Sequence, residues 1–152
     1  MSAAQRSIRE QASRARQASL VLASLDAQTK NSVLLQLAEA IDAEQRAILD
    51  ANAADLRDAA AAGLSAPKLQ RLALTPAALG QMVEGLRQIA KAPDPVGAVT
   101  LERTAPSGLR VRKVRAPLGV VAMIYEARPN VTIDAFALCF KAGNACILKG
   151  GK

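Results

Sequence analysis

Hydrophobic residues in the first two-thirds of the chain recur every three or four positions, which is the spacing of helices that bury one face. Gly63 is placed to end one of these helices in the left-handed conformation that glycine adopts easily. The predicted helices cover residues 3–23, residues 43–62, residues 67–72, a segment that starts at Asp26 or Thr29 and runs through Ile41, and a segment from Thr75 and Pro76 to the residues before Pro93.

Between residues 96 and 115 the hydrophobic period drops to two, which is typical of β-strands. Val99 and Leu101 alternate with small or polar residues, and the same alternation follows Leu109. Residues 105–108 (APSG) lie between the two halves and have the composition of a turn. The pattern predicts a β-hairpin that adds to a sheet elsewhere, because a two-stranded hairpin is marginally stable alone.

The end of the chain has the pattern strand, helix, strand. Residues 120–124 form an apolar run that is too short for a helix and has no polar face, so we expect it to be buried on both sides. Helical spacing follows from Pro129 or Asn130 as far as Gly143, and residues 146–148 form a second apolar run. Together these segments predict a βαβ unit with two parallel strands.

Polar residues gather where each of these two strands ends, at 125–130 and at 149–152. Ligands of open α/β sheets bind outside the carboxyl ends of the strands, so both clusters are predicted at one edge of the sheet. Basic groups there can hold a carboxylate or phosphate, and an asparagine amide can donate to a developing oxyanion. The candidate residues are Glu126, Arg128, Asn130, Lys149 and Lys152.

Each candidate also has a purely structural interpretation. Asn130 could cap the helix that follows it. Glu126 and Arg128 could form an ion pair with each other, and Lys149 could be a charged residue that leaves the sheet. The sequence pattern alone leaves both interpretations open.

Composition and charge narrow the class of ligand. The chain carries a net charge of +7, and residues 100–152 hold nine basic and three acidic side chains. A basic segment suits an anionic small molecule and a nucleic acid equally well by charge alone. Since aromatic residues make up only 2% of the chain, stacking side chains for bases are scarce, and the sequence argues against nucleic acid.

The cysteine and histidine content argues against metal binding and against a cysteine nucleophile. The chain has no histidine, and Cys139 and Cys146 fall where a buried helix face and a buried strand are expected, so the sequence predicts neither a metal site nor a cysteine nucleophile. Reduced core cysteines fit a cytoplasmic protein. No segment is long and apolar enough to predict a membrane span, and both the dinucleotide glycine fingerprint and the phosphate loop are absent.

Three phrases closely resemble the gamma-glutamyl phosphate reductase family of proline biosynthesis: YEARPNVT at 125–132, AGNA at 142–145 and ILKGG at 147–151. The resemblance extends over essentially the whole chain. It implies the α/β fold of the aldehyde dehydrogenase superfamily, whose Rossmann-like cofactor domain lacks the glycine fingerprint. It also implies that the chain is an N-terminal portion, because family members are much longer.

The resemblance implies a division of the chain into three parts. Residues 1–95 would be the helical part of the cofactor-binding domain, and residues 116–152 its first βαβ unit. Residues 96–115 resemble the superfamily's oligomerisation arm, which implies a homo-oligomer. The catalytic domain would lie outside this chain.

The activity that the resemblance implies is the NADPH-dependent reduction of L-glutamyl 5-phosphate to L-glutamate 5-semialdehyde with release of phosphate. In the family the substrate acylates a cysteine of the catalytic domain, which neither Cys139 nor Cys146 matches. We therefore expect this chain alone to be inactive. An association with glutamate 5-kinase is a further partner that the resemblance suggests.

The resemblance also implies roles for individual residues, according to their positions in the matching phrases. Lys149 matches the superfamily lysine that binds the adenosine ribose or its phosphate, and Gly150 and Gly151 follow it. Glu126 and Arg128 fall on the substrate side, and Asn130 corresponds loosely to the oxyanion asparagine. The alternative from another class is a non-catalytic module that binds a nucleotide or assembles through its hairpin.

Overall fold

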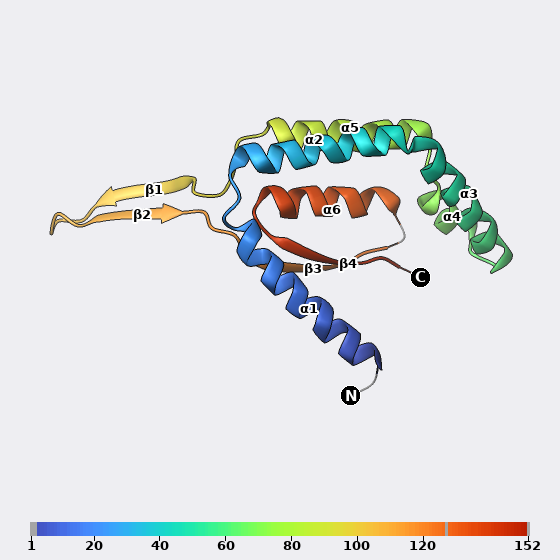
Figure 1. Cartoon of the computed structure of the whole chain (residues 1–152), viewed down its shortest axis with the longest axis horizontal. Coiled ribbons are helices and arrows are strands. Elements are labelled where there is room, and N and C mark those ends of the chain that lie inside the picture. The colour runs from blue at the N-terminus through green and yellow to red at the C-terminus, as the bar shows by residue number, and fades with distance from the viewer. Residues whose placement is uncertain (1–2, 127, 152) are drawn as a thin grey trace.

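The computed structural model describes residues 3–126 and 128–151 and has the α/β fold that the sequence predicts (Figure 1). Every predicted helix and strand is present, and the largest difference in bounds is three residues, at the first strand of the hairpin, which the sequence predicts from Val96 and which starts at Val99. None of the described helices is long and apolar enough to cross a membrane. In chain order the elements are α1 (Ala3–Leu22), α2 (Ala27–Ala43), α3 (Gln45–Ala61), α4 (Ala66–Leu72), α5 (Pro76–Lys91), β1 (Val99–Thr104), β2 (Arg110–Val114), β3 (Val120–Ile124), α6 (Pro129–Lys141) and β4 (Ala145–Lys149).

Local hydrogen bonds explain where several helices begin and end. Of the two predicted starts of α2, Asp26 is the N-cap, and its carboxylate accepts from the backbone N–H of Thr29 at 2.6 Å. The hydroxyl of Thr75 accepts from the N–H of Ala78 at 3.1 Å and caps α5 in the same way. Gly63 follows α3 with φ of +79°, as its position predicts.

The hydrophobic core lies between α2, α5 and α6, which pack on one another (Figure 1). Leu34 and Ala38 of α2 and Leu79 and Leu86 of α5 are each at most 2% exposed. Burying one such leucine contributes about 1.5–3 kcal/mol. This core holds α6 against the helical layer, and α6 in turn positions the edge of the sheet where the candidate site lies.

Asn52, in the middle of α3, is a buried polar side chain that joins two parts of the helical layer. Its amide nitrogen donates to the carbonyl of Leu72 at 3.0 Å, and its amide oxygen accepts from the N–H of Leu74 at 2.8 Å. Leu72 is the last residue of α4, and Leu74 lies in the connection between α4 and α5. One side chain therefore fixes that connection, which forms a wall of the candidate site.

We expect Asn52→Ala to lower the free energy of unfolding by about 1–3 kcal/mol, because it leaves a partly buried N–H and carbonyl without their partner. The measurement is urea unfolding followed by circular dichroism. Asp55→Ala is the matched control: Asp55 is exposed on the same helix, and its loss should change stability by less than about 0.5 kcal/mol. Equal losses in the two variants would contradict the role of Asn52.

β3 and β4 pair in parallel, with Val120 opposite Ala145 and Ile124 opposite Lys149, as the βαβ pattern predicts. Helix α6 packs on β4 from one side and α1 from the other (Figure 1). The expectation that β3 is buried on both faces is wrong, because Ile124 is 85% exposed. In the described part of the chain the two helices pack chiefly on β4, and β3 lies at the margin of the layers that they form.

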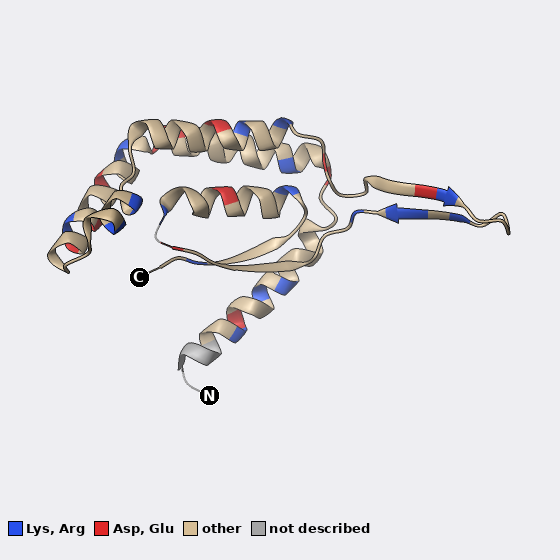
Figure 2. Ribbon diagram, turned by 180° about the vertical axis from the view of Figure 1, so that it is seen from behind, with Lys and Arg blue, Asp and Glu red and all other residues tan. Residues whose placement is uncertain are grey.

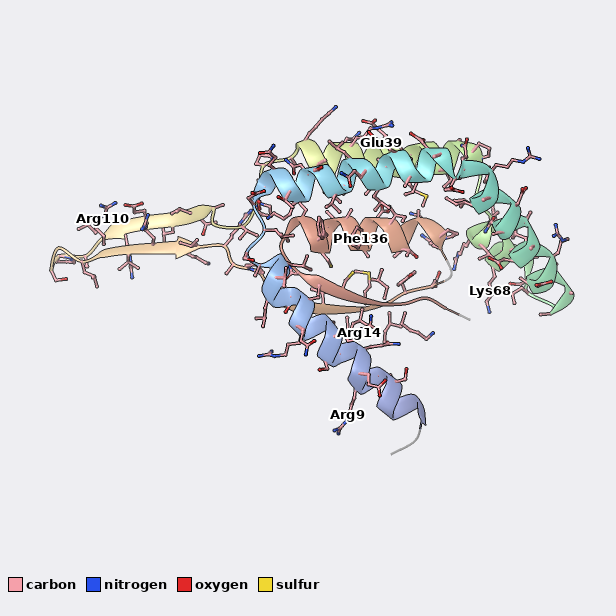
Figure 3. The ribbon with its side chains drawn as sticks, in the orientation of Figure 1. Arg9, Arg14, Glu39, Lys68, Arg110 and Phe136 are labelled. Carbon is pink, nitrogen blue, oxygen red and sulfur yellow. The ribbon has the colours of Figure 1, made fainter. Side chains whose placement is uncertain are left out.

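The predicted hairpin is present and extends away from the helical layers (Figures 1 and 2). β1 and β2 pair antiparallel, and every residue of both strands is exposed. Arg110 donates to Glu102 across the strands at 2.6 Å. Figure 3 shows Arg110 and the other hairpin side chains extending into open space. The hairpin therefore has two uncovered faces, as expected for a segment that adds to another sheet.

Two buried lysines lie where α2, α6 and the end of α5 meet. Lys30 is 1% exposed, and its ammonium is 2.5 Å from a carboxylate oxygen of Asp94. Lys141 is 4% exposed and donates to the side chain of Asn31 at 2.5 Å and to the carbonyl of Ala90 at 3.0 Å. These contacts join the helical core to the segment that leads into β1, so they fix the base of the hairpin.

Burial and neighbouring charges shift the pKa values of Asp94 and Lys141. Partial burial acts to raise the pKa of Asp94, but hydrogen bonds from Lys30 and from the backbone N–H of Val96 outweigh it, so the pKa lies below its usual range. Burial lowers the pKa of Lys141, and the negative charge of Asp94 opposes that effect. The carboxylate of Asp94 therefore offsets part of the cost of burying the charge of Lys141.

Candidate functional site

The carboxyl ends of β3 and β4 lie level with each other. Ile124 is opposite Lys149 in the register, and the N–H of Tyr125 donates to the carbonyl of Lys149 at 3.1 Å. The polar segments that follow the two strands therefore start from the same edge of the sheet. Figure 1 shows this edge on the side of the molecule where α3 and α4 lie.

Glu126 has a partner that sequence reasoning missed. Nη1 of Arg71, at the end of α4, donates to Oε2 of Glu126 at 3.0 Å, whereas Nε of Arg128 is 4.0 Å from the same oxygen. The predicted ion pair between Glu126 and Arg128 is thus the longer of two contacts. Each of these side chains is about half exposed or more, so the ion pair adds little stability and mainly orients Arg71.

Asn130 lies in the first turn of α6 but does not cap it. The cap position belongs to Arg128, whose side chain makes no capping hydrogen bond. The amide nitrogen of Asn130 instead faces a carboxylate oxygen of Asp134, one turn later, at 3.4 Å. The helix-capping interpretation of Asn130 is therefore wrong.

A cavity of about 390 Å³ separates the start of α6 from the connection between α4 and α5. Its polar lining comes from Arg71, Gln81, Asn130 and Asp134, and Pro129 adds an apolar side. Of the predicted site residues that the structure describes, only Asn130 lines this cavity. Arg71, Gln81 and Asp134 come from three separate helices, which is why no local motif indicated them.

The predicted cofactor residues lie at the end of β4 and directly after it, outside this cavity. Lys149 is exposed, and its ammonium donates to the carbonyl of Gly150 at 2.6 Å. A side chain at Gly150 would contact the ring of Tyr125 at 3.8 Å, and the hydroxyl of Tyr125 lies 2.6 Å from that of Thr132. Gly151 is exposed as well. Lys152, a further candidate of the sequence pattern, lies outside the described residues.

The two cysteines are half-buried rather than fully buried as expected, and both are free thiols. Burial raises the pKa of Cys139; it also raises the pKa of Cys146, with a further contribution from the neighbouring Cys139. A raised pKa leaves little thiolate near neutral pH, which disfavours a nucleophilic role. Across 3–126 and 128–151, no group of three or more histidine, cysteine or acidic residues could hold a metal ion.

Comparison with known proteins shows what this chain is similar to. No family model matches the chain. A curated gamma-glutamyl phosphate reductase from Opitutus terrae is 52% identical over 141 residues, which are 93% of this chain and 33% of that protein. The chain therefore spans about a third of the length of the curated relatives that it matches.

Solved structures of the same enzyme share the fold. Gamma-glutamyl phosphate reductase from Thermotoga maritima superposes with a TM-score of 0.87 at 35% identity, over 93% of this chain and 34% of that one. The enzyme from Saccharomyces cerevisiae gives 0.91 at 37% identity, over 100% of this chain and 38% of that one. The likeness in sequence and the likeness in fold therefore cover nearly the same residues.

Proposed function

We propose that this chain, which belongs to the gamma-glutamyl phosphate reductase family and spans about a third of its members, contributes part of a reductase site. The reaction converts L-glutamyl 5-phosphate, NADPH and a proton into L-glutamate 5-semialdehyde, inorganic phosphate and NADP⁺. This is a step of proline biosynthesis. The observation that carries the proposal is identity of about 50% along 93% of the chain.

The substrate side of the proposed site is the segment after β3. Arg128 offers a planar guanidinium that suits the oxygens of an acyl phosphate. Asn130 offers an amide N–H that can donate to the carbonyl oxygen as negative charge develops on it. In this proposal Glu126 acts through Arg71, which it orients with the 3.0 Å ion pair.

The cofactor side of the proposed site is the last residue of β4 and the segment after it. Lys149 is exposed at the strand end, where its ammonium can meet a ribose phosphate as a point charge. Gly150 and Gly151 carry no side chain, so their backbone can approach a bound nucleotide closely. NADPH would supply the hydride, and these three residues would hold it at the sheet edge.

For the chain by itself, the alternative is a non-catalytic module that assembles through β1 and β2. The full exposure of both strands favours this role, since an uncovered hairpin is a template for pairing with another chain. We expect no reductase turnover from the chain alone, because neither of its cysteines matches the family's nucleophile, and burial raises the pKa of both. The two roles are compatible, and the hairpin would then join copies of the reductase.

The proposed function is tested by a chimera in which this chain replaces the matching 34% of the Thermotoga maritima enzyme. We expect the chimera to oxidise NADPH in the presence of glutamyl phosphate. Lys149→Ala should raise KM for NADPH by about 10–100-fold and leave KM for NADH nearly unchanged, because NADH lacks the 2′-phosphate. Initial rates at varied cofactor concentration give both constants.

Lys91→Ala is the control for this prediction, since Lys91 is exposed at the far end of α5 and belongs to no proposed site. Its kinetic constants should match those of the unmodified chimera. A folded chimera without turnover would contradict the proposed function. An equal change in KM for NADPH and NADH would contradict the assignment of Lys149 to the 2′-phosphate.

A further inference from the structure

The cavity between α6 and the α4–α5 connection has the size of a site for a small metabolite. Its volume of about 390 Å³ lies in the range of sites that hold small molecules, about 300–1,000 Å³. The buried Asn52 fixes the α4–α5 wall, and the core fixes α6, so the cavity is preformed. A preformed polar cavity can select a ligand by the placement of its charges.

The charges around this cavity are of both signs. Arg71 supplies a cation from the end of α4, and Asp134 supplies an anion from α6. Gln81 and Asn130 add amides that can donate or accept. A simple dianion would be attracted by Arg71 but repelled by Asp134. Paired opposite charges instead match a ligand that carries a carboxylate and an ammonium group on neighbouring atoms.

Both charged groups retain hydrogen-bonding capacity for such a ligand. Glu126 accepts from one terminal nitrogen of Arg71, and a guanidinium has five N–H donors in a fixed plane. Asp134 accepts from Asn130 at 3.4 Å, a long contact that uses little of the carboxylate's capacity. Arg71 is therefore oriented but still able to form a bidentate contact with a carboxylate.

We propose that this cavity binds the free α-amino-acid end of the substrate, with Arg71 on the α-carboxylate and Asp134 on the α-ammonium group. The inference rests on the proposed function and deepens it, because the glutamyl substrate carries both groups. Asn130 lines the same cavity. One bound substrate molecule can therefore contact Arg71 and Asp134 with its α-amino-acid end and the amide of Asn130 with its reacting end. Arg71 and Asp134 thereby set specificity for an α-amino acid.

The test is a titration of the 152-residue chain with L-glutamate, glutarate and 4-aminobutyrate, followed by isothermal calorimetry. Glutarate lacks the ammonium group, and 4-aminobutyrate lacks the α-carboxylate. We expect L-glutamate to bind at least about tenfold more tightly than either analogue. Arg71→Gln should remove the preference over 4-aminobutyrate, and Asp134→Asn should remove the preference over glutarate.

Two control variants accompany this titration. Arg87→Gln changes another exposed arginine that pairs with a carboxylate, Asp42, outside the cavity, and should leave all three affinities unchanged. Arg71→Lys keeps the charge without the planar fork and should restore part of the affinity that Arg71→Gln loses. Circular dichroism shows whether each variant is folded.

Equal affinity for the three ligands, or no binding of L-glutamate by the folded chain, would overturn the inference. The same holds if Arg71→Gln and Asp134→Asn bind L-glutamate as tightly as Arg87→Gln does. These outcomes are independent of the chimera's turnover. An inactive chimera whose chain binds L-glutamate selectively contradicts the reductase alone, and an active chimera without that selectivity contradicts the cavity assignment alone.

Discussion

Asp94→Asn is expected to lower the free energy of unfolding by about 3–5 kcal/mol, because it leaves the ammonium of Lys30 buried without its carboxylate partner. Lys30 is 1% exposed, so water cannot replace the lost charge. Among the described residues, Lys30 also donates to the carbonyl of Lys141 at 3.3 Å, which is neutral. When the substituted amide accepts from the N–H of Val96 through its oxygen, its NH2 group takes the place of Oδ2 beside the ammonium of Lys30. The variant therefore removes both the charge and the acceptor of that contact. Urea unfolding at neutral pH measures the loss.

An exposed ion pair between two helices provides the control. Arg87 and Asp42 approach to 2.8 Å, but their side chains are 40% and 50% exposed. Asp42→Asn should therefore cost less than about 1 kcal/mol. A double variant that replaces Lys30 by methionine and Asp94 by leucine should recover much of the loss, since an apolar pair needs no charge compensation. Equal losses for Asp94→Asn and Asp42→Asn would contradict the explanation.

The ion pair between Lys30 and Asp94 should contribute a part of the free energy of unfolding that is lost in acid. Because the pKa of Asp94 is lower in the folded protein, its contribution is present at pH above the pKa of the unfolded chain. It is lost as the pH falls through the lowered pKa of the folded state. Asp94→Asn lacks this contribution, so the stability difference between the two proteins should shrink as the pH falls through that window.

The helices and the hairpin could be predicted because their signals are local. Apolar spacing, the caps at Asp26 and Thr75 and the glycine after α3 each act within a few residues. Burial of β3 could not be predicted in the same way. It depends on which helices pack on the strand, and a short apolar run contains no information about that.

The candidate site could be predicted only in part, for a similar reason. The strand-end residues follow from the βαβ pattern, but Arg71 reaches Glu126 across 55 positions and no motif joins them. The buried lysines did leave a signal. Lys30 lies one turn before Leu34 on the same helical stripe, so its position predicts burial even though its charge suggests exposure. A charged residue within an apolar stripe therefore indicates a distant partner.

Gly143→Ala is expected to lower the free energy of unfolding by about 2–5 kcal/mol for two separate reasons. The residue has φ of +73°, where a side chain costs about 1–2 kcal/mol. A Cβ atom would also lie 2.9 Å from Cγ of Pro117 and 3.4 Å from Cγ2 of Val96. The proline ring cannot rotate away, so relieving the contact requires a backbone shift that costs about a further 1–3 kcal/mol.

That shift would reach the start of the sheet. Asn144, the next residue, accepts from the N–H of Gly119 at 2.9 Å through its side chain, and Ala145 donates to the carbonyl of Gly119 at 2.9 Å. These contacts align the first residues of β3 and β4, whose far ends carry the candidate site. We therefore expect Gly143→Ala in the chimera to lower kcat/KM as well as stability, although Gly143 lies at the opposite end of the strands.

Gly63→Ala separates the two causes. Gly63 has nearly the same backbone conformation, with φ of +79°, but a Cβ atom there meets nothing within 4 Å. Its substitution should cost only the conformational part, about 1–2 kcal/mol. Adding Pro117→Ala to Gly143→Ala should recover part of the remainder, since the two residues are in contact. If both glycine variants lose the same stability, the contact with Pro117 makes no contribution and the backbone conformation explains the whole effect.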